Sequence, residues 1–202
     1  MSKMHEKIPL VALCGAIGLA AATLAVMGVD PEGIRRALRI TARYSYLWFW
    51  PAYAGGALAA LSGLQPLARY GRTFGLAFVA AQSIHLILVL WLYRLSPEPP
   101  IPIGGAIFFG IGMLFMYLLA ALSIKRIARK IDPRTWRLAM LVGLEYIEYA
   151  FLTDFWVNPL HHLTVGQWVL YLPFMMLGLL GTGLRLLRWS LGVAQQRHTQ
   201  SN

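Results

Sequence analysis

Three ionisable side chains lie deep inside apolar stretches of the sequence, where a charge is costly. His85 lies in the middle of GRTFGLAFVAAQSIHLILVLWLYR (71–94), and Glu145 and Glu148 lie in a later stretch. Insertion scales give about 2.5 to 3.5 kcal/mol for an Asp, Lys or Arg at the centre of a membrane helix. Ionisable residues that are kept at such depth are therefore candidates for function.

Spacing places the polar residues of the later stretch on one side of a helix. Glu145, Glu148 and Tyr149 follow one another at intervals of three and one residues, so they share a helical face. A helix rises about 1.5 Å per residue, which puts His85 and Glu148 at similar depth if both helices start at the same membrane surface. The two stretches are therefore predicted to form one intramembrane polar centre.

Three chemical roles suit this centre. His85 could be an axial ligand of haem iron, with the porphyrin held between helices. Alternatively, His85 and the two glutamates form a proton or cation path, because a buried carboxyl exchanges protons near neutral pH. In the third interpretation the glutamates are protonated or paired with Arg or Tyr, and the histidine hydrogen-bonds across the bundle. The residues alone leave these three roles open.

The composition is that of a membrane protein. Of 202 residues, 58% are hydrophobic and 13% are charged, whereas soluble domains carry roughly 25% charged residues. Several apolar runs are long enough to cross a hydrocarbon core of about 30 Å. The net charge of +10 comes from Arg and Lys between these runs, so it indicates topology and not nucleic-acid binding. The single cysteine, Cys14, excludes a disulfide and a Cys-based metal site.

We expect an all-α protein: a polytopic six-transmembrane-helix bundle that forms a single membrane domain over residues 1–202. The predicted helices cover about 8–28, 41–62, 72–94, 103–124, 135–157 and 166–189. The first apolar run exceeds the ~7 to 15 residues of a signal-peptide core, so we expect it to be a retained anchor.

Two further segments have expected roles. Asp30 to Ile40 opens with Asp-Pro and is predicted to form a short amphipathic helix on the outer surface. The adjacent pair His161 and His162 is expected to be exposed in an outer loop.

The distribution of basic residues predicts the orientation. One side of the predicted bundle holds thirteen Lys and Arg residues and the other holds five. Because cytoplasmic loops carry the excess of basic residues, both termini are predicted to be cytoplasmic.

Short motifs agree with this order of helices. Phe74-Gly75-Leu76 opens the third helix and His85 follows ten residues after the glycine, Ile40 to Arg43 reads ITAR before helix two, and residues 125–136 read KRIARKIDPRTW before helix five. With these features the chain resembles the ferric-reductase-like transmembrane domain superfamily. Within it, the resemblance is to the haem-binding membrane subunit of the bacterial periplasmic methionine sulfoxide reductase system.

This resemblance implies a multi-pass subunit of the bacterial inner membrane that passes electrons across the bilayer through b-type haem to a periplasmic acceptor. His85 would be the haem ligand and Arg43 a partner for a propionate. The donor would be a separate reductase or the quinone pool, since no Rossmann fingerprint follows the last helix. The histidines of the family's fifth helix correspond to Met140 and Thr153 here, of which only Met140 can ligate iron.

A second hypothesis does not involve redox chemistry. A divergent member without haem would be a proton-linked transport component or a membrane assembly factor, with Glu145 and Glu148 as its polar centre. A third is a passive membrane protein held together by glycine-rich helix packing.

Overall fold

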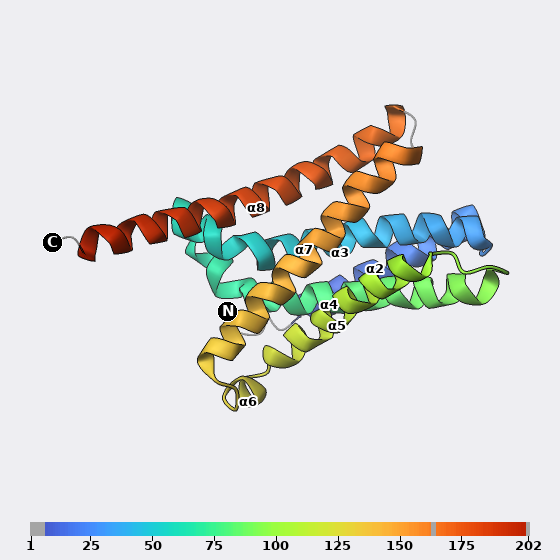
Figure 1. The fold of residues 1–202 in the computed structure, drawn as a ribbon. Helices are drawn as coiled ribbons and strands as arrows, with labels where there is room; N and C mark the ends of the chain where they lie inside the picture. Colours follow the sequence, from blue (N-terminus) through green and yellow to red (C-terminus); the bar gives the residue numbers. More distant parts are fainter. Residues whose placement is uncertain (1–6, 163–164, 201–202) are drawn as a thin grey trace. The chain divides into compact units, whose positions relative to one another are not determined.

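All regular elements in the described part of the chain are helices. The computed structural model describes the backbone of residues 7–162 and 165–200 and the side chains of residues 7–156 and 169–192. The helices, shown in Figure 1, are α2 (Ile8–Met27), α3 (Pro31–Ser62), α4 (Gln65–Leu95), α5 (Ile103–Leu122), α6 (Lys125–Ala128), α7 (Pro133–His162) and α8 (Val165–Gln200). The predicted all-α class is therefore confirmed.

Four helices in this part of the chain are long and apolar enough to cross a membrane. They are α2, α4, α5 and, within α8, Val169–Gly192. The chain is therefore a membrane-embedded protein with four candidate spans, where the sequence predicts six. The two long helices outside this group, α3 and α7, carry the most deeply buried polar side chains, Thr41, Ser45 and Glu148.

The helix α3 begins ten residues earlier than predicted. Asp30–Ile40 does not form a separate surface helix, because α3 starts at Pro31 and continues without a break to Ser62. Ile34 and Ala37 are fully buried and pack against Ala20 of α2 and Leu88 of α4. Burial of these apolar side chains joins the segment to the bundle.

The other boundaries also differ from the prediction. The helix α4 begins at Gln65, seven residues before the predicted start, and α7 and α8 extend beyond their predicted ends to His162 and Gln200. The side chains of His161 and His162 lie outside the described residues, so their predicted exposure stays a prediction.

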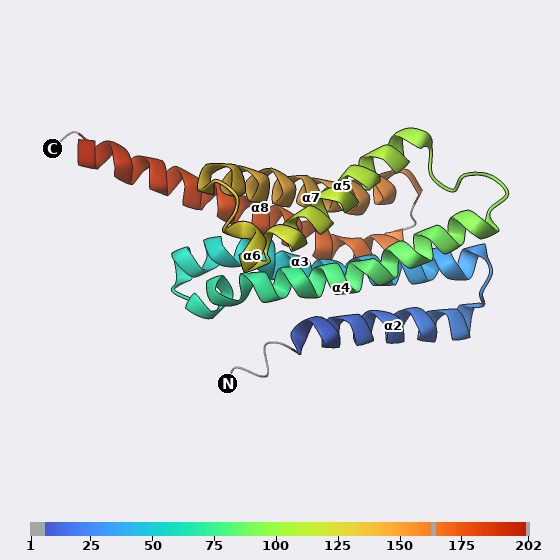
Figure 2. The same ribbon diagram turned by 90° about the horizontal axis from the view of Figure 1, so that it is seen from below.

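The chain divides into two compact units, each described here by itself. The first contains Met1–Phe49 and Arg72–Ala150, and the second contains Trp50–Gly71 and Phe151–Asn202. In the first unit α2 lies along α4 (Figure 2), with Ala12 and Ala16 packed against Ala77 and Ala81. Small residues at four-residue spacing let two helix backbones approach closely, which is how helices associate where lipid offers no hydrophobic driving force.

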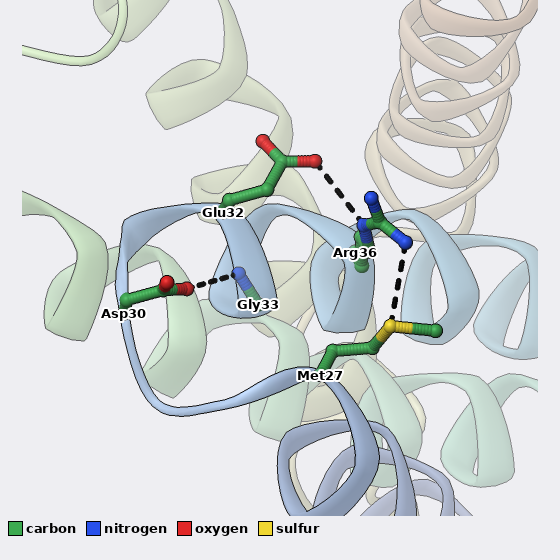
Figure 3. A network of polar contacts seen from close by, with 5 residues as sticks. All are labelled: Met27, Asp30, Glu32, Gly33 and Arg36. Atoms are coloured by element: carbon green, nitrogen blue, oxygen red, sulfur yellow. Dashed lines mark hydrogen bonds and ion pairs between the residues drawn. The ribbon is translucent and has the colours of Figure 1, made fainter.

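A tight turn joins α2 to α3 in the first unit. Gly28 has a φ of 91°, and the Asp30 carboxylate accepts a hydrogen bond from the Gly33 N–H at 2.8 Å. The Arg36 guanidinium contacts both Glu32, at 3.2 Å, and the Met27 sulfur, at 3.3 Å (Figure 3). These contacts fix the start of α3 and so the register of its polar residues.

The start of α7 is fixed by a cap and by contacts with α5. The Asp132 carboxylate accepts hydrogen bonds from the backbone N–H groups of Thr135 and Arg134 at 3.0 and 2.9 Å, and the bond from Thr135 contributes most to a lowered pKa of Asp132. A lowered pKa means that this cap stabilises the fold at neutral pH and is lost as the pH falls through the acidic range. Further along α7, the Tyr146 hydroxyl donates to the Phe108 carbonyl at 3.0 Å.

In the second unit, the end of α3 is held against α8. The Trp50 indole donates to the Leu177 carbonyl at 2.7 Å, and the Arg185 guanidinium donates to the Tyr53 carbonyl at 3.0 Å while lying 4.5 Å from the Tyr53 ring centroid. A Cβ on Gly181 would lie 3.0 Å from the Trp50 nitrogen, so a glycine here allows the close contact.

We expect Gly33→Ala to destabilise the protein, because its Cβ would lie 2.0 Å from the Gly28 carbonyl oxygen. Overpacking of this kind costs about 1 to 3 kcal/mol. The matched control is Gly18→Ala in α2, whose Cβ meets nothing within 4 Å. Thermal unfolding in detergent measures both variants, and equal melting temperatures would show that the turn does not constrain α3.

Candidate functional site

His85 faces α3 in the first unit. Its Nδ1 lies 3.2 Å from the Thr41 hydroxyl oxygen. Thr41 is fully buried and His85 is partly buried. A residue of the neighbouring helix therefore contacts the imidazole at Nδ1.

The hydrogen-bond network assigns the proton on this ring. The Thr41 hydroxyl donates back to the Ala37 carbonyl at 2.9 Å, so its oxygen is left to accept from His85. The Leu38 carbonyl, 3.2 Å from the Thr41 hydroxyl oxygen, is a second acceptor for the proton of that hydroxyl. We therefore assign the imidazole proton to Nδ1. The neutral ring then carries its free electron pair on Nε2, the arrangement found in histidines that bind metals.

A second polar pair lies one turn away between the same two helices. The Ser45 hydroxyl, fully buried on α3, hydrogen-bonds to the Gln82 side-chain oxygen on α4. Sequence reasoning missed both residues. The available signal is the spacing: Gln82 precedes His85 by three residues and Ser45 follows Thr41 by four, so each pair shares a helical face.

Glu148 is the most deeply buried acid in the described part of the chain, with 1% of its surface exposed. The Tyr46 hydroxyl lies 3.0 and 3.2 Å from its two carboxylate oxygens, and Tyr46 is itself fully buried on α3. The sequence identifies Glu148 as a candidate, but Tyr46 appears there only as an apolar aromatic. The polar centre therefore joins α7 to α3.

The other predicted site residues on α7, Glu145, Tyr149 and Met140, are less buried than Glu148. Glu145 is partly buried, whereas Tyr149 is 61% exposed and packs edge-on against Phe108 at 5.7 Å. Met140 is partly buried and lies eight residues before Glu148 on α7, which is about 12 Å along the helix. The predicted common face of Glu145, Glu148 and Tyr149 therefore divides into a buried and an exposed part.

Arg43 lies on the α3 face that carries Tyr46. The two residues are three positions apart, so their side chains are neighbours on the helix surface. Arg43 is partly buried. Its predicted contact with a propionate stays a prediction, but its position brings a positive charge to the side of α3 that meets Glu148.

The described residues supply one strong iron ligand at this site. Among them no group of three or more His, Cys, Asp and Glu side chains could hold a metal ion. If iron were held at His85, its second ligand would have to come from a weaker donor such as the Met140 thioether. A cavity of about 500 Å³, lined by Gln65, Pro66, Ala68, Arg69 and Tyr70, belongs to the second unit.

No protein-family model, curated protein or solved structure matches the chain. The resemblance to ferric-reductase-like domains therefore rests on the short motifs around Gly75, His85 and Arg43 and at residues 125–136.

We expect Thr41→Val to destabilise the protein by about 1 to 3 kcal/mol, because it leaves the partly buried imidazole N–H of His85 without its acceptor. Thr41→Ser keeps the hydroxyl and is the matched control. Denaturant unfolding in detergent gives the stability, and the ¹⁵N shifts of the His85 ring report its tautomer. Equal unfolding of the two variants would contradict the assigned hydrogen bond.

Proposed function

We propose that the chain is the membrane subunit of an electron-transfer system, which passes electrons across the bacterial inner membrane through b-type haem to a periplasmic acceptor. The single observation that carries this proposal is the orientation of His85. Thr41 engages the imidazole at Nδ1 from α3, and the Nδ1 tautomer leaves Nε2 as an electron-pair donor.

Each candidate residue has a role in this proposal. His85 would hold the iron through Nε2, Met140 would be the candidate for its second ligand, and Arg43 would pair with a propionate. Haem, when bound, supplies reversible one-electron chemistry. Thr41 keeps the His85 ring in one tautomer and one orientation, and the surrounding apolar helices exclude water. A separate reductase or the quinone pool supplies the electrons.

The proposed topology has six spans and both termini in the cytoplasm. The helices α3 and α7 contain 32 and 30 residues, so each is longer than the ~20 residues that cross a bilayer. The polar side chains that lower their hydropathy include Thr41, Ser45 and Glu148, which are buried against other helices. Cysteine labelling of the loop at residues 125–132 from either side of the membrane tests the orientation.

The first test is an absorption spectrum of the purified protein, oxidised and reduced, from haem-replete cells. We expect a haem spectrum that His85→Ala abolishes. Gln82→Leu is the matched control, since it changes a polar residue on the same face of α4 and keeps the ligand. A colourless wild-type preparation would reject the proposal.

The second test concerns the other axial ligand. We expect Met140→Leu to convert a six-coordinate low-spin haem into a five-coordinate high-spin one, because leucine has no donor atom. Met140→His should retain the low-spin state, since imidazole is a stronger ligand than a thioether. Electron paramagnetic resonance distinguishes the two spin states. An unchanged spectrum in Met140→Leu would assign this position to another residue.

The burial of Glu148 against Tyr46 favours a second candidate function. A haem-less protein with this pair at its centre would be a proton-linked transport component or a membrane assembly factor. Proton flux into liposomes, followed with a pH-sensitive dye, would then depend on Glu148 and not on His85. A colourless preparation whose flux is lost in Glu148→Gln would support this candidate.

A further inference from the structure

The connection between α5 and α7 carries a dense group of positive charges. Residues 125–137 contain six basic side chains and one acid, Asp132. The Asp132 carboxylate already accepts hydrogen bonds from the backbone N–H groups of Arg134 and Thr135. The basic residues are all exposed, and none of them forms an ion pair with a carboxylate of the described residues: Lys125, Arg126, Arg129, Lys130, Arg134 and Arg137. These charges are therefore open to an anionic partner.

The first part of this connection, residues 124–129, is an amphipathic segment. Backbone hydrogen bonds between residues four positions apart hold it in helical turns. With about 3.6 residues per turn, its apolar and basic positions fall on opposite sides. The apolar side consists of Ile124, Ile127 and Ala128, and the basic side consists of Lys125, Arg126 and Arg129. The protein leaves the two isoleucines uncovered, with 48% and 37% of their surfaces exposed.

The amphipathic segment lies at the end of a membrane span. Leu122 is the last residue of α5, which is long and apolar enough to cross a membrane. The Trp136 indole N–H donates to the Leu122 carbonyl at 3.3 Å, so the start of α7 lies beside the end of α5 (Figure 1). Tryptophan is enriched at the boundary between membrane and water. The segment between these two residues is therefore held close to the membrane surface.

We propose that residues 124–129 bind the anionic lipids of the leaflet at this end of α5. The two isoleucines enter the boundary between headgroups and lipid chains, and the long basic side chains reach the lipid phosphates from the other side. An acidic protein would match the charges but leave the isoleucines uncovered, whereas lipid accounts for both sides. The electron-transfer proposal does not use this surface, so either proposal can fail without the other.

The first test is native mass spectrometry of the purified full chain with equal amounts of phosphatidylglycerol and phosphatidylcholine. We expect the wild type to retain phosphatidylglycerol with a preference of roughly tenfold, because several cations at one surface attract the anionic headgroup. Lys125→Gln, Arg126→Gln and Arg129→Gln together should abolish the preference. These side chains are exposed, so the thermal unfolding of the variant should match that of the wild type.

A matched control removes the same charge elsewhere. Arg35→Gln, Arg39→Gln and Arg94→Gln together also remove three exposed positive charges, and this variant should keep the preference. Equal losses in the two variants would show that net charge attracts the lipid, and would overturn the proposal. Inorganic phosphate should not displace phosphatidylglycerol, since it has no acyl chain. Displacement by phosphate, or no preference in the wild type, would overturn a lipid site, and the second result would leave the charges to an acidic protein.

A depth measurement in vesicles tests the apolar side. An environment-sensitive fluorophore is attached to Ile127→Cys or to Arg129→Cys, with the exposed Cys14 replaced by serine. In phosphatidylglycerol vesicles we expect blue-shifted emission at position 127 and emission typical of water at position 129. Emission typical of water at both positions would show that the isoleucines do not enter the membrane and would overturn the proposal.

Discussion

Side chains on the first half of α3 hold the neighbouring helices together through buried hydrogen bonds. Thr41 binds His85 and Ser45 binds Gln82 on α4, and Tyr46 binds Glu148 on α7. In lipid a polar side chain without a partner costs several kcal/mol, since no water replaces the lost bond. These contacts therefore fix the register of α4 and α7 against α3. They do so in a bundle whose remaining contacts are largely between small or apolar side chains.

The polar role of α3 accounts for its sequence. A helix that faces lipid on most sides has to be apolar all round, as α2 and α5 are, with a mean hydropathy above 2. A helix enclosed by others can carry Thr41, Ser45 and Tyr46, all fully buried. The mean hydropathy by which spanning helices are identified is therefore lower for α3, whose polar side chains bond to neighbouring helices. Both α3 and α7, which carry the buried polar side chains, fall outside the group of four candidate spans.

Local sequence patterns predicted the helices well and their partners poorly. The helix α2 was predicted at about 8–28 and observed at Ile8–Met27 because its apolar run ends at a glycine. The early start of α3 was not predicted, because Arg35, Arg36 and Arg39 make this segment resemble a surface helix. Ile34 and Ala37 are buried there by helices elsewhere in the chain. His85 and Glu148 were identified by the cost of burying an ionisable group. Tyr46, 102 residues from Glu148, could not be paired with it without the packing of α3 against α7.

The orientation of His85 separates the two chemical roles that the sequence had placed in one centre. Because Thr41 engages the ring at Nδ1 from α3, Nε2 is the nitrogen available to a ligand. Glu148 is held at both oxygens by Tyr46, and about 12 Å of α7 separates it from Met140. A thioether and a carboxylate that far apart on one helix cannot bind the same iron. Met140 and Glu148 are therefore alternative partners, and not joint ligands, for any iron held at His85.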